Sequence, residues 1–227
     1  MNTGYYDTFN EHLLHDEKPS LYFTNLMNAG EFPIEFPFNM LMQLKNTPQN
    51  PKYHPEGNAF NHTMQVVDQA AILNKSSKEP AIFMWTALLH DIGKGPTTQM
   101  RKGKITSYNH ETEGAVMDEN FLTYFHQPND FIQSVCKMIK WHMQPLFLSK
   151  NLPFSKLDAM IKEVSVSELG LFSLCDRLGR APMSRVRQEE EYRDILSFFE
   201  KCLPKVKDSY EQKRINELSY YMKRDVS

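Results

Sequence analysis

The stretch LLHDIGKGPTT, residues 88 to 98, places an imidazole, a carboxylate and an ammonium group directly after the apolar end of a predicted helix. His90, Asp91 and Lys94 carry these groups. Burying them without partners would cost several kcal/mol, so the cluster needs either a structural partner or a chemical role. Adjacent His and Asp side chains can fill part of the coordination sphere of a metal ion. The remaining ligands must then come from other helices.

His62 and Asp176 are the best candidates for these ligands. His62 stands beside the apolar stripe of the preceding predicted helix, and Asp176 lies in LGLFSLCDRLGR, a mostly buried helix in which a carboxylate needs a cation. Two imidazoles and two carboxylates suit Mn, Ni, Fe, Co or Zn better than calcium, with Mg as a further candidate. We therefore expect His62, His90, Asp91 and Asp176 to converge on one divalent metal ion.

A second ion is also compatible with the sequence. His110 in SYNHETEG and His142 in IKWHM lie near the predicted core, and Asp91 can bridge from the first ion to them. Two ions about 3.5–4 Å apart clamp the attacking and leaving oxygens of a phosphoryl transfer, with a metal-activated water as the nucleophile. If only one ion binds, we expect both imidazoles to contact phosphate instead. The sequence leaves the choice between one ion and two open.

Two cations can neutralise the charge of a phosphate. Lys94 follows Asp91 by three residues, at the expected rim of the site, and Arg180 follows Asp176 by one helical turn. The planar guanidinium of arginine matches phosphate oxygens. The candidate catalytic residues are Asp91, Lys94 and His110, and the candidate substrate-binding residues are Lys94, Arg180 and His142.

Each of these residues also has an ordinary structural interpretation. A single histidine on an apolar helix face is usually a hydrogen-bonded core residue. Asp176 and Arg180 can form a simple ion pair, worth about 0.3–0.5 kcal/mol if exposed, and Lys94 can stabilise a helix C-terminus through the helix dipole. Three further histidines fit a core or exposed position without a site: His12, His15 and His126.

The composition supports a globular protein in a reducing compartment. Of 227 residues, 41% are hydrophobic and 24% are charged, and the net charge of -2 favours neither nucleic acid nor an anionic membrane. The three cysteines have no paired spacing, which argues against disulfides and zinc fingers. The first residues lack the pattern of a signal peptide, and no apolar run reaches the ~18 residues of a membrane span. We expect a cytoplasmic protein without membrane association.

Helical periodicity dominates the chain, so the expected fold class is all-α, with no sheet of three or more strands. Residues 45–58 and 95–108 are expected to be loops, the second folding over a site. The sequence predicts a short helix from Ser20 that ends at Gly30, a helix carrying His62, and further helices at about 80–90, 109–125, 129–143, 155–163, 167–179, 184–203 and 206–223.

These residues resemble a known family. The order His62, His90-Asp91, Asp176 resembles the H…HD…D signature of the HD-domain metal-dependent phosphohydrolases. The segments PQNPKYHPEGNAFNHTMQVVDQAA, ALLHDIGKGPTT, HETEGA, KWHM and DRLGR are similar to successive motifs of the HD domain in bacterial CCA-adding tRNA nucleotidyltransferases, and KPSLYFTNLMNAGEFPIEFP is similar to the helical segment before that domain. The resemblance covers roughly residues 15 to 200. It implies an all-helical HD fold, and we expect a helical lead-in (1–52), an HD phosphohydrolase domain (53–203) and a C-terminal helix packed on it (204–227).

The resemblance also implies an activity. In the resembling enzymes, the HD domain hydrolyses small phosphate substrates such as 2′,3′-cyclic nucleotides, nucleoside monophosphates and phosphatase test compounds. It assigns His62, His90, Asp91 and Asp176 to the metal, and His110 and His142 to a second metal or the phosphate.

The chain also departs from the resembling enzymes. It has no D-x-D pair, and barely fifty residues precede the HD region, so we do not expect nucleotide addition to tRNA. Asn58 stands where the motif more often has Asp. The expected partner is a small phosphate compound, a nucleotide above all; tRNA is an unsupported alternative, and the oligomeric state is open.

Two other functions remain as alternatives. Some HD proteins with six such ligands bind two irons and oxidise a small molecule, and the present set would permit that chemistry. A non-catalytic nucleotide-binding module is the second alternative. The intact ligand set argues against it, because a degenerate site would have lost one or more ligands.

Overall fold

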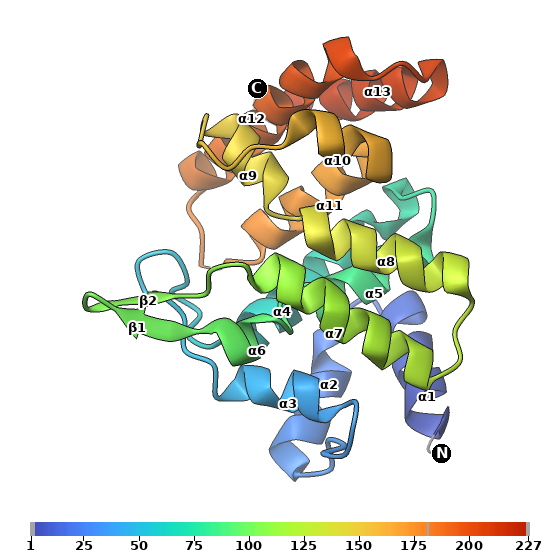
Figure 1. Cartoon of the computed structure of the whole chain (residues 1–227), viewed down its shortest axis with the longest axis vertical. Coiled ribbons are helices and arrows are strands. Elements are labelled where there is room, and N and C mark those ends of the chain that lie inside the picture. The colour runs from blue at the N-terminus through green and yellow to red at the C-terminus, as the bar shows by residue number, and fades with distance from the viewer. Residues whose placement is uncertain (1–2, 181, 226–227) are drawn as a thin grey trace.

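The computed structural model describes residues 3–180 and 182–225, and these fold into helices with one small hairpin (Figure 1). The all-α class predicted from the sequence is confirmed, and no sheet of three or more strands occurs in the described ranges. The elements are α1 (Thr3–His15), α2 (Ser20–Ala29), α3 (Asn39–Lys45), α4 (Ala59–Leu73), η1 (Asn74–Ser76), α5 (Pro80–Leu89), α6 (Lys94–Thr97), β1 (Gln99–Arg101), β2 (Lys104–Thr106), α7 (His110–Tyr124), α8 (Asn129–Trp141), α9 (Gln144–Ser149), α10 (Leu157–Glu163), α11 (Val166–Leu178), α12 (Arg185–Cys202), η2 (Leu203–Lys205) and α13 (Ser209–Asp225).

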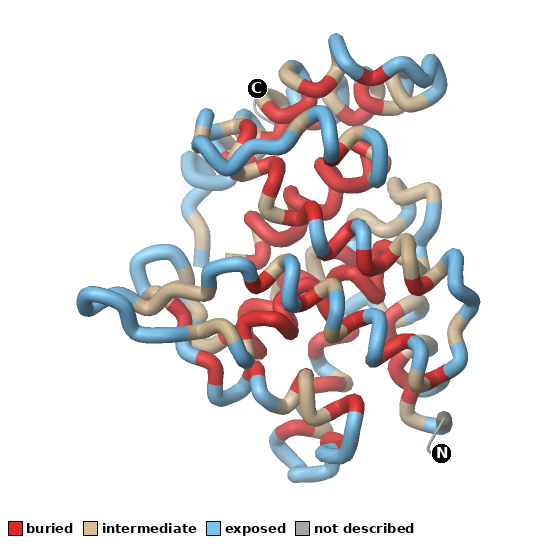
Figure 2. The backbone as a smooth tube through the Cα atoms, viewed as in Figure 1, coloured by how far each residue is buried: buried red, intermediate tan, exposed pale blue. Residues whose placement is uncertain are grey.

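Helices α4, α5 and α11 pack against one another in the middle of the molecule, where Figure 2 shows the largest concentration of buried backbone. Helix α5 reads PAIFMWTALL and is apolar around nearly its whole circumference, so burial on all sides is the arrangement that removes it from water. Helix α11 is buried along almost its entire length as well. Polar side chains carried by these three helices therefore have to be satisfied inside the protein.

The N-terminal helices pack on this centre through aromatic side chains. Phe9 of α1 contacts the rings of Phe23 and Phe38 edge-on, at centroid distances of 4.9 and 5.2 Å. Tyr6 stacks on Trp85 of α5 at 4.5 Å. Such aromatic pairs add about 0.5–1.5 kcal/mol each beyond the area they bury. The lead-in helices are thus fixed to the central helices.

The segment 45–58 is an ordered loop, as expected, and it ends in a helix cap. The Asn58 side chain accepts a hydrogen bond of 2.8 Å from the Asn61 amide, which fixes the start of α4. The Ala59 amide donates to the Thr47 carbonyl at 3.0 Å, tying the two ends of the loop together. An amide oxygen at position 58 therefore serves as the cap, and it sets the rotation of the helix that carries His62.

Residues 95–108 differ from the expected plain loop. Lys94–Thr97 form the short helix α6, and β1 and β2 pair antiparallel with Met100 opposite Ile105. Lys102 and Gly103, at the tip, both have positive φ angles (49° and 73°), the backbone that tight hairpins require. The strands have only three residues each, too short to produce an alternating pattern in the sequence.

The C-terminal helices α12 and α13 pack on each other and on α11, at the opposite end of the molecule from α2 and α3 (Figure 1). Each buries apolar residues: Ile195, Phe198 and Phe199 on α12, and Ile215, Leu218 and Met222 on α13. Within the described residues, no helix combines the length and the apolar character needed to cross a membrane.

Candidate metal centre

The structure brings together all six side chains that the sequence singled out as metal ligands. They are buried, and they come from five helices or helix ends: His62 (α4), His90 and Asp91 (end of α5), His110 (start of α7), His142 (end of α8) and Asp176 (α11). Two groups of three have ligand atoms within 4.8 Å of one another: His62, His90 and Asp91, and Asp91, His110 and His142. Asp91 belongs to both groups.

Backbone carbonyls orient three of the four imidazoles. The Nδ1 atoms of His90, His110 and His142 lie 3.0, 2.8 and 2.7 Å from carbonyl oxygens three residues earlier in the chain. A carbonyl oxygen can only accept, so each Nδ1 carries the proton and donates. In a neutral imidazole, the lone pair is then on Nε2. A neutral ring held in this way presents Nε2 in the form that ligates metals.

Two of these Nε2 atoms, those of His110 and His142, face each other. The Nε2 atoms of His110 and His142 are 3.1 Å apart. Burial lowers the pKa of His110 to about 3 and that of His142 to about 4, so both rings are neutral near pH 7 and neither Nε2 holds a proton to share. Two lone pairs at this distance repel unless a cation lies within reach of both. The pair therefore fits a metal ion.

Asp91 presents its two oxygens to different histidines. Oδ1 lies 3.5 Å from Nε2 of His110, and Oδ2 lies 3.3 Å from Nε2 of His90 and 3.8 Å from Nε2 of His62. The Lys94 ammonium lies 2.7 Å from Asp91 Oδ2, whereas His90 Nε2 is buried without a hydrogen-bond partner. Buried polar atoms without partners are rare and require an explanation. A divalent cation held by His90 and Asp91 would supply one.

Lys94 is buried rather than at the rim of the site, where the sequence placed it. Lys94 is 8% exposed. Its ammonium donates a hydrogen bond to Gln49 Oε1 at 2.7 Å. It also forms an ion pair with Asp91 Oδ2 at 2.7 Å, although the geometry is not that of a hydrogen bond. The cause is the tight turn after α5, in which the Lys94 amide donates to the Asp91 carbonyl. Burial raises the pKa of Asp91, but His90 and Lys94 outweigh this effect and hold it well below its usual value.

Asp176 and Arg180 form the other charged side of the centre. His62 Nε2 lies 2.9 Å from Asp176 Oδ1, and Nη2 of Arg180 lies 3.3 and 3.4 Å from the two oxygens of the same carboxylate.

Burial raises the pKa of Asp176, but Arg180 and the hydrogen bond from His62 hold it well below the usual value. Burial lowers the pKa of His62, but its bonds to Asp176 and Glu56 raise it overall. A metal ion at Nε2 of His62 would therefore displace a proton.

Gly93 lets the two halves of the site approach each other. A Cβ atom at this position would lie 2.1 Å from the His110 carbonyl oxygen and 2.5 Å from the Gly114 amide nitrogen. The first turn of α7 thus packs directly on the backbone of the turn after α5. This contact brings His110 within reach of Asp91, and it explains why a glycine follows Ile92.

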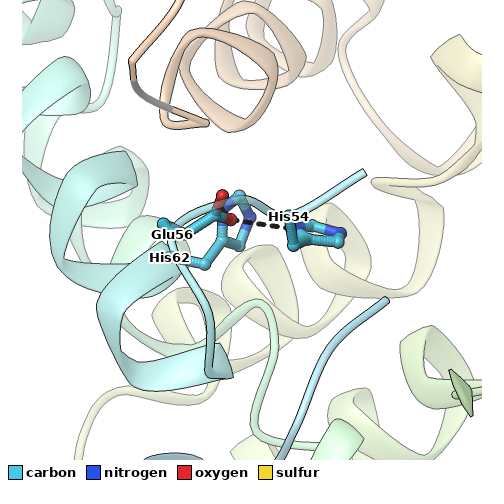
Figure 3. Close-up of side chains that lie close together, drawn as sticks. All are labelled: His54, Glu56 and His62. Carbon is cyan, nitrogen blue, oxygen red and sulfur yellow. Dashed lines mark hydrogen bonds and ion pairs between the residues drawn. The ribbon is translucent and has the colours of Figure 1, made fainter. Parts of the chain in front are cut away.

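Sequence reasoning missed His54 and Glu56, which precede α4. Oε1 of Glu56 lies 2.8 Å from Nδ1 of His54 and 3.0 Å from Nδ1 of His62, and Figure 3 shows the carboxylate beside both rings. These three residues form a third group with ligand atoms within 4.8 Å. The available signal was an H-x-E sequence shortly before the helix that carries a candidate ligand.

The other histidines lie outside the site, in agreement with their ordinary interpretation. His12 hydrogen-bonds to Asp16 at 2.8 Å and stacks on Tyr22, His15 lies near Glu11, and His126 is exposed. None of the three belongs to the groups of potential metal ligands among the described residues.

The sequence model of the HD domain family matches residues 59–181, more than half of the chain. The chain therefore belongs to the HD domain family, a superfamily of metal-dependent phosphohydrolases. The matched range contains the five residues of the two groups that share Asp91, and also Asp176, which lies in neither group but is hydrogen-bonded to His62.

The similar curated proteins include several named multifunctional CCA protein. One from Pasteurella multocida (strain Pm70) is 28% identical over 184 residues, which are 78% of this chain and 43% of that protein. One from Actinobacillus pleuropneumoniae serotype 5b is 36% identical over 100 residues, 43% of this chain and 23% of its own length. One from Hahella chejuensis is 32% identical over 129 residues, 57% of this chain and 29% of its own length. The chain thus spans less than half the length of the curated relatives it matches.

Proposed function

We propose that the protein is a metal-dependent phosphohydrolase that acts on nucleotide-type phosphomonoesters or 2′,3′-cyclic phosphodiesters. One observation carries the proposal: Asp91 lies between His90, whose buried Nε2 has no hydrogen-bond partner, and the pair His110 and His142, whose Nε2 atoms face one another at 3.1 Å. A mixed N/O set of this kind suits Mn, Fe, Co, Ni or Zn. The HD domain match supports the same class of reaction.

Positively charged side chains beside the centre favour an anionic substrate. Arg180 contacts Asp176, but its buried Nε has no hydrogen-bond partner, so the guanidinium keeps a donor for a substrate oxygen. Arg180 also lines a cleft of about 470 Å³, together with Lys52, Tyr53 and Arg187. Ligand pockets commonly have volumes of about 300–1,000 Å³. We infer that the phosphate enters from this cleft, with the Tyr53 ring and the Lys52 ammonium available to the rest of a nucleotide.

The residues divide the work as follows. A bound divalent metal supplies a Lewis acid and lowers the pKa of a coordinated water to about 7. Asp91 orients that centre with both carboxylate oxygens, and Lys94 balances the negative charge of Asp91. Arg180 binds phosphate oxygens, and His110 and His142 hold a second cation or contact the phosphate.

The test combines metal analysis with a substrate panel. Purified protein is stripped with a chelator, reloaded separately with Mn²⁺, Ni²⁺, Fe²⁺, Co²⁺, Zn²⁺ and Mg²⁺, and assayed with nucleoside monophosphates, 2′,3′-cyclic nucleotides and a simple aryl phosphate. We expect hydrolysis that is lost on chelation and restored by at least one transition metal.

Two other outcomes would contradict the proposal. Turnover that requires dioxygen, together with a mixed-valent iron signal, would assign the site to oxidation chemistry. Nucleotide binding without hydrolysis under every metal would assign it to a binding module. Assays under anaerobic and aerobic conditions, and a binding measurement with each nucleotide, separate these outcomes.

A further inference from the structure

Glu56 has no role in the proposed reaction, yet it occupies a well-defined position beside the metal centre. It lies in the loop before α4, and its side chain is fully buried. One oxygen, Oε1, is within hydrogen-bond distance of Nδ1 of His54 at 2.8 Å and of Nδ1 of His62 at 3.0 Å (Figure 3). The other oxygen has no partner among the described residues.

The direction of these hydrogen bonds follows from the groups involved. A carboxylate only accepts, so both imidazoles donate from Nδ1. For His62 this leaves Nε2 as the atom that faces Asp176 and Asp91, at 2.9 and 3.8 Å. The Gly179 carbonyl, 3.2 Å from the same Nδ1, is a second acceptor but carries no charge. Glu56 is therefore the charged group behind His62.

His54 holds this carboxylate from the other side. Its side chain is only 14% exposed, and its ring packs edge-on against that of His62 at a centroid distance of 4.8 Å. Because Oε1 receives both donors, loss of one histidine still leaves the other to hold Glu56. Loss of the carboxylate removes the connection entirely.

We propose that Glu56 is a positioning residue of the metal centre, which orients His62 and strengthens it as a ligand through its Nδ1, while His54 holds Glu56 in place. The inference rests on the proposed function only in requiring that a metal binds. Ligating histidines commonly donate their second N–H to a carboxylate, and removing such a partner typically costs about 10–100-fold in metal affinity or activity. The Nδ1 atoms of His90, His110 and His142 donate to neutral carbonyls instead. Glu111 lies 3.6 Å from Nδ1 of His110, outside hydrogen-bond distance, so Glu56 still distinguishes His62 from the other three.

The experiment measures binding of Co²⁺ to chelator-stripped protein by calorimetry, and the visible spectrum of the loaded protein. The variants are Glu56→Ala, Glu56→Gln, His54→Ala and the control Glu211→Gln. Glu211 is a matched carboxylate because it accepts hydrogen bonds from Ser165, Ser167 and Lys78, away from the clustered ligands. Circular dichroism melting of the metal-free proteins checks that each variant is folded.

We expect Glu56→Ala to lower the affinity for Co²⁺ about 10–100-fold, with an altered Co²⁺ spectrum and unchanged stoichiometry. Glu56→Gln keeps an acceptor oxygen but no charge, so it should recover part of the affinity and also serves as the test if the alanine variant does not fold. His54→Ala should have a smaller effect than Glu56→Ala, and Glu211→Gln should bind as wild type does.

Three outcomes would overturn the inference. Wild-type affinity in both Glu56 variants would show that the carboxylate is not needed behind His62. Loss of one full metal equivalent, with unchanged affinity for the rest, would make Glu56 a ligand instead. An equal loss of affinity in Glu211→Gln would indicate a general effect on folding. Failure of the wild type to bind any metal would instead refute the proposed function, so the two failures are distinguishable.

Discussion

His62 and Asp176 meet at 2.9 Å although they are 114 positions apart in the chain. His62 is carried by α4 and Asp176 by α11, two helices packed in the middle of the molecule. The candidate ligands therefore come together only when the central helices are assembled. Metal binding and folding are coupled as a result, because an ion that binds the assembled cluster stabilises the folded state.

Chelation should lower the thermal stability of the protein. A ligand at 100 times its dissociation constant stabilises the folded state by about 2.7 kcal/mol, and for a chain of this size each kcal/mol corresponds to roughly 2–4 °C in Tm. Thermal melting with and without a chelator, followed by readdition of Mn²⁺, measures the effect. Identical melting curves in the three conditions would show that no ion binds the folded protein tightly.

Asp91→Ala should abolish turnover and reduce the metal content together. Asp91 is the residue shared by both groups of ligand atoms, with one oxygen 3.5 Å from His110 and the other 3.3 Å from His90. Elemental analysis and the phosphatase assay on the same preparation check both effects, with Asp158→Ala, an exposed carboxylate, as the control. Wild-type activity in Asp91→Ala would exclude the proposed site.

His110→Ala and His142→Ala should each remove about one metal equivalent and leave the ion at His62, His90, Asp91 and Asp176 in place. The reason is that Asp91 turns Oδ1 toward His110 and Oδ2 toward His90 and His62, which suits a bridge between two ions. Metal stoichiometry under identical loading is the measurement, with His126→Ala as control. Unchanged stoichiometry with a higher KM would instead indicate one ion, with both imidazoles on the substrate.

The sequence predicted the all-α fold class, and the structure places its candidate ligands close together, for a physical reason. Helices with long apolar stripes reveal their buried face, so polar residues such as His62 and Asp176 on that face stand out. The sequence did not reveal the burial of Lys94, because this depends on a tight turn and on Gln49 from a distant loop. It also missed Glu56, because a carboxylate in a proline-rich loop carries no periodicity that would show its burial.

Lys94→Met should reduce turnover, and it should destabilise the metal-free protein more than the metal-bound protein. Removing one partner of a buried ion pair leaves the other charge uncompensated, at a cost of about 3–5 kcal/mol, and Asp91 would be that charge. A metal ion at Asp91 should restore most of the stability, whereas turnover should stay about 10–100-fold lower, because Asp91 loses the ammonium that holds and balances it beside the metal. Urea denaturation with and without Mn²⁺ measures the first effect and steady-state kinetics the second. Lys140→Met, which breaks an exposed pair with Glu163, is the control. Equal destabilisation of Lys94→Met with and without metal would contradict this role.

Asp118→Asn should stabilise the protein near neutral pH. Asp118 on α7 is fully buried, and neither carboxylate oxygen has a hydrogen-bond partner among the described residues. Burial raises its pKa well above the usual value. The folded state thus holds the proton more tightly than the unfolded state, whose pKa is about 3.9. The stability conferred by that proton is fully present below pH ~3.9 and is lost as the pH rises through the folded pKa.

Asn cannot ionise, so the difference in unfolding free energy between Asp118→Asn and wild type should be small at pH 3.5 and should grow with pH. Each pKa unit between the folded and unfolded states corresponds to about 1.4 kcal/mol of this difference. Urea denaturation of metal-free protein at a series of pH values between 3.5 and 8 measures it, and the comparison cancels the titration of all other groups. Asp7→Asn, which changes an exposed carboxyl on α1, should show no such growth. A difference that is independent of pH, or a variant less stable than wild type at pH 8, would mean that Asp118 is ionised and stabilised in the folded protein.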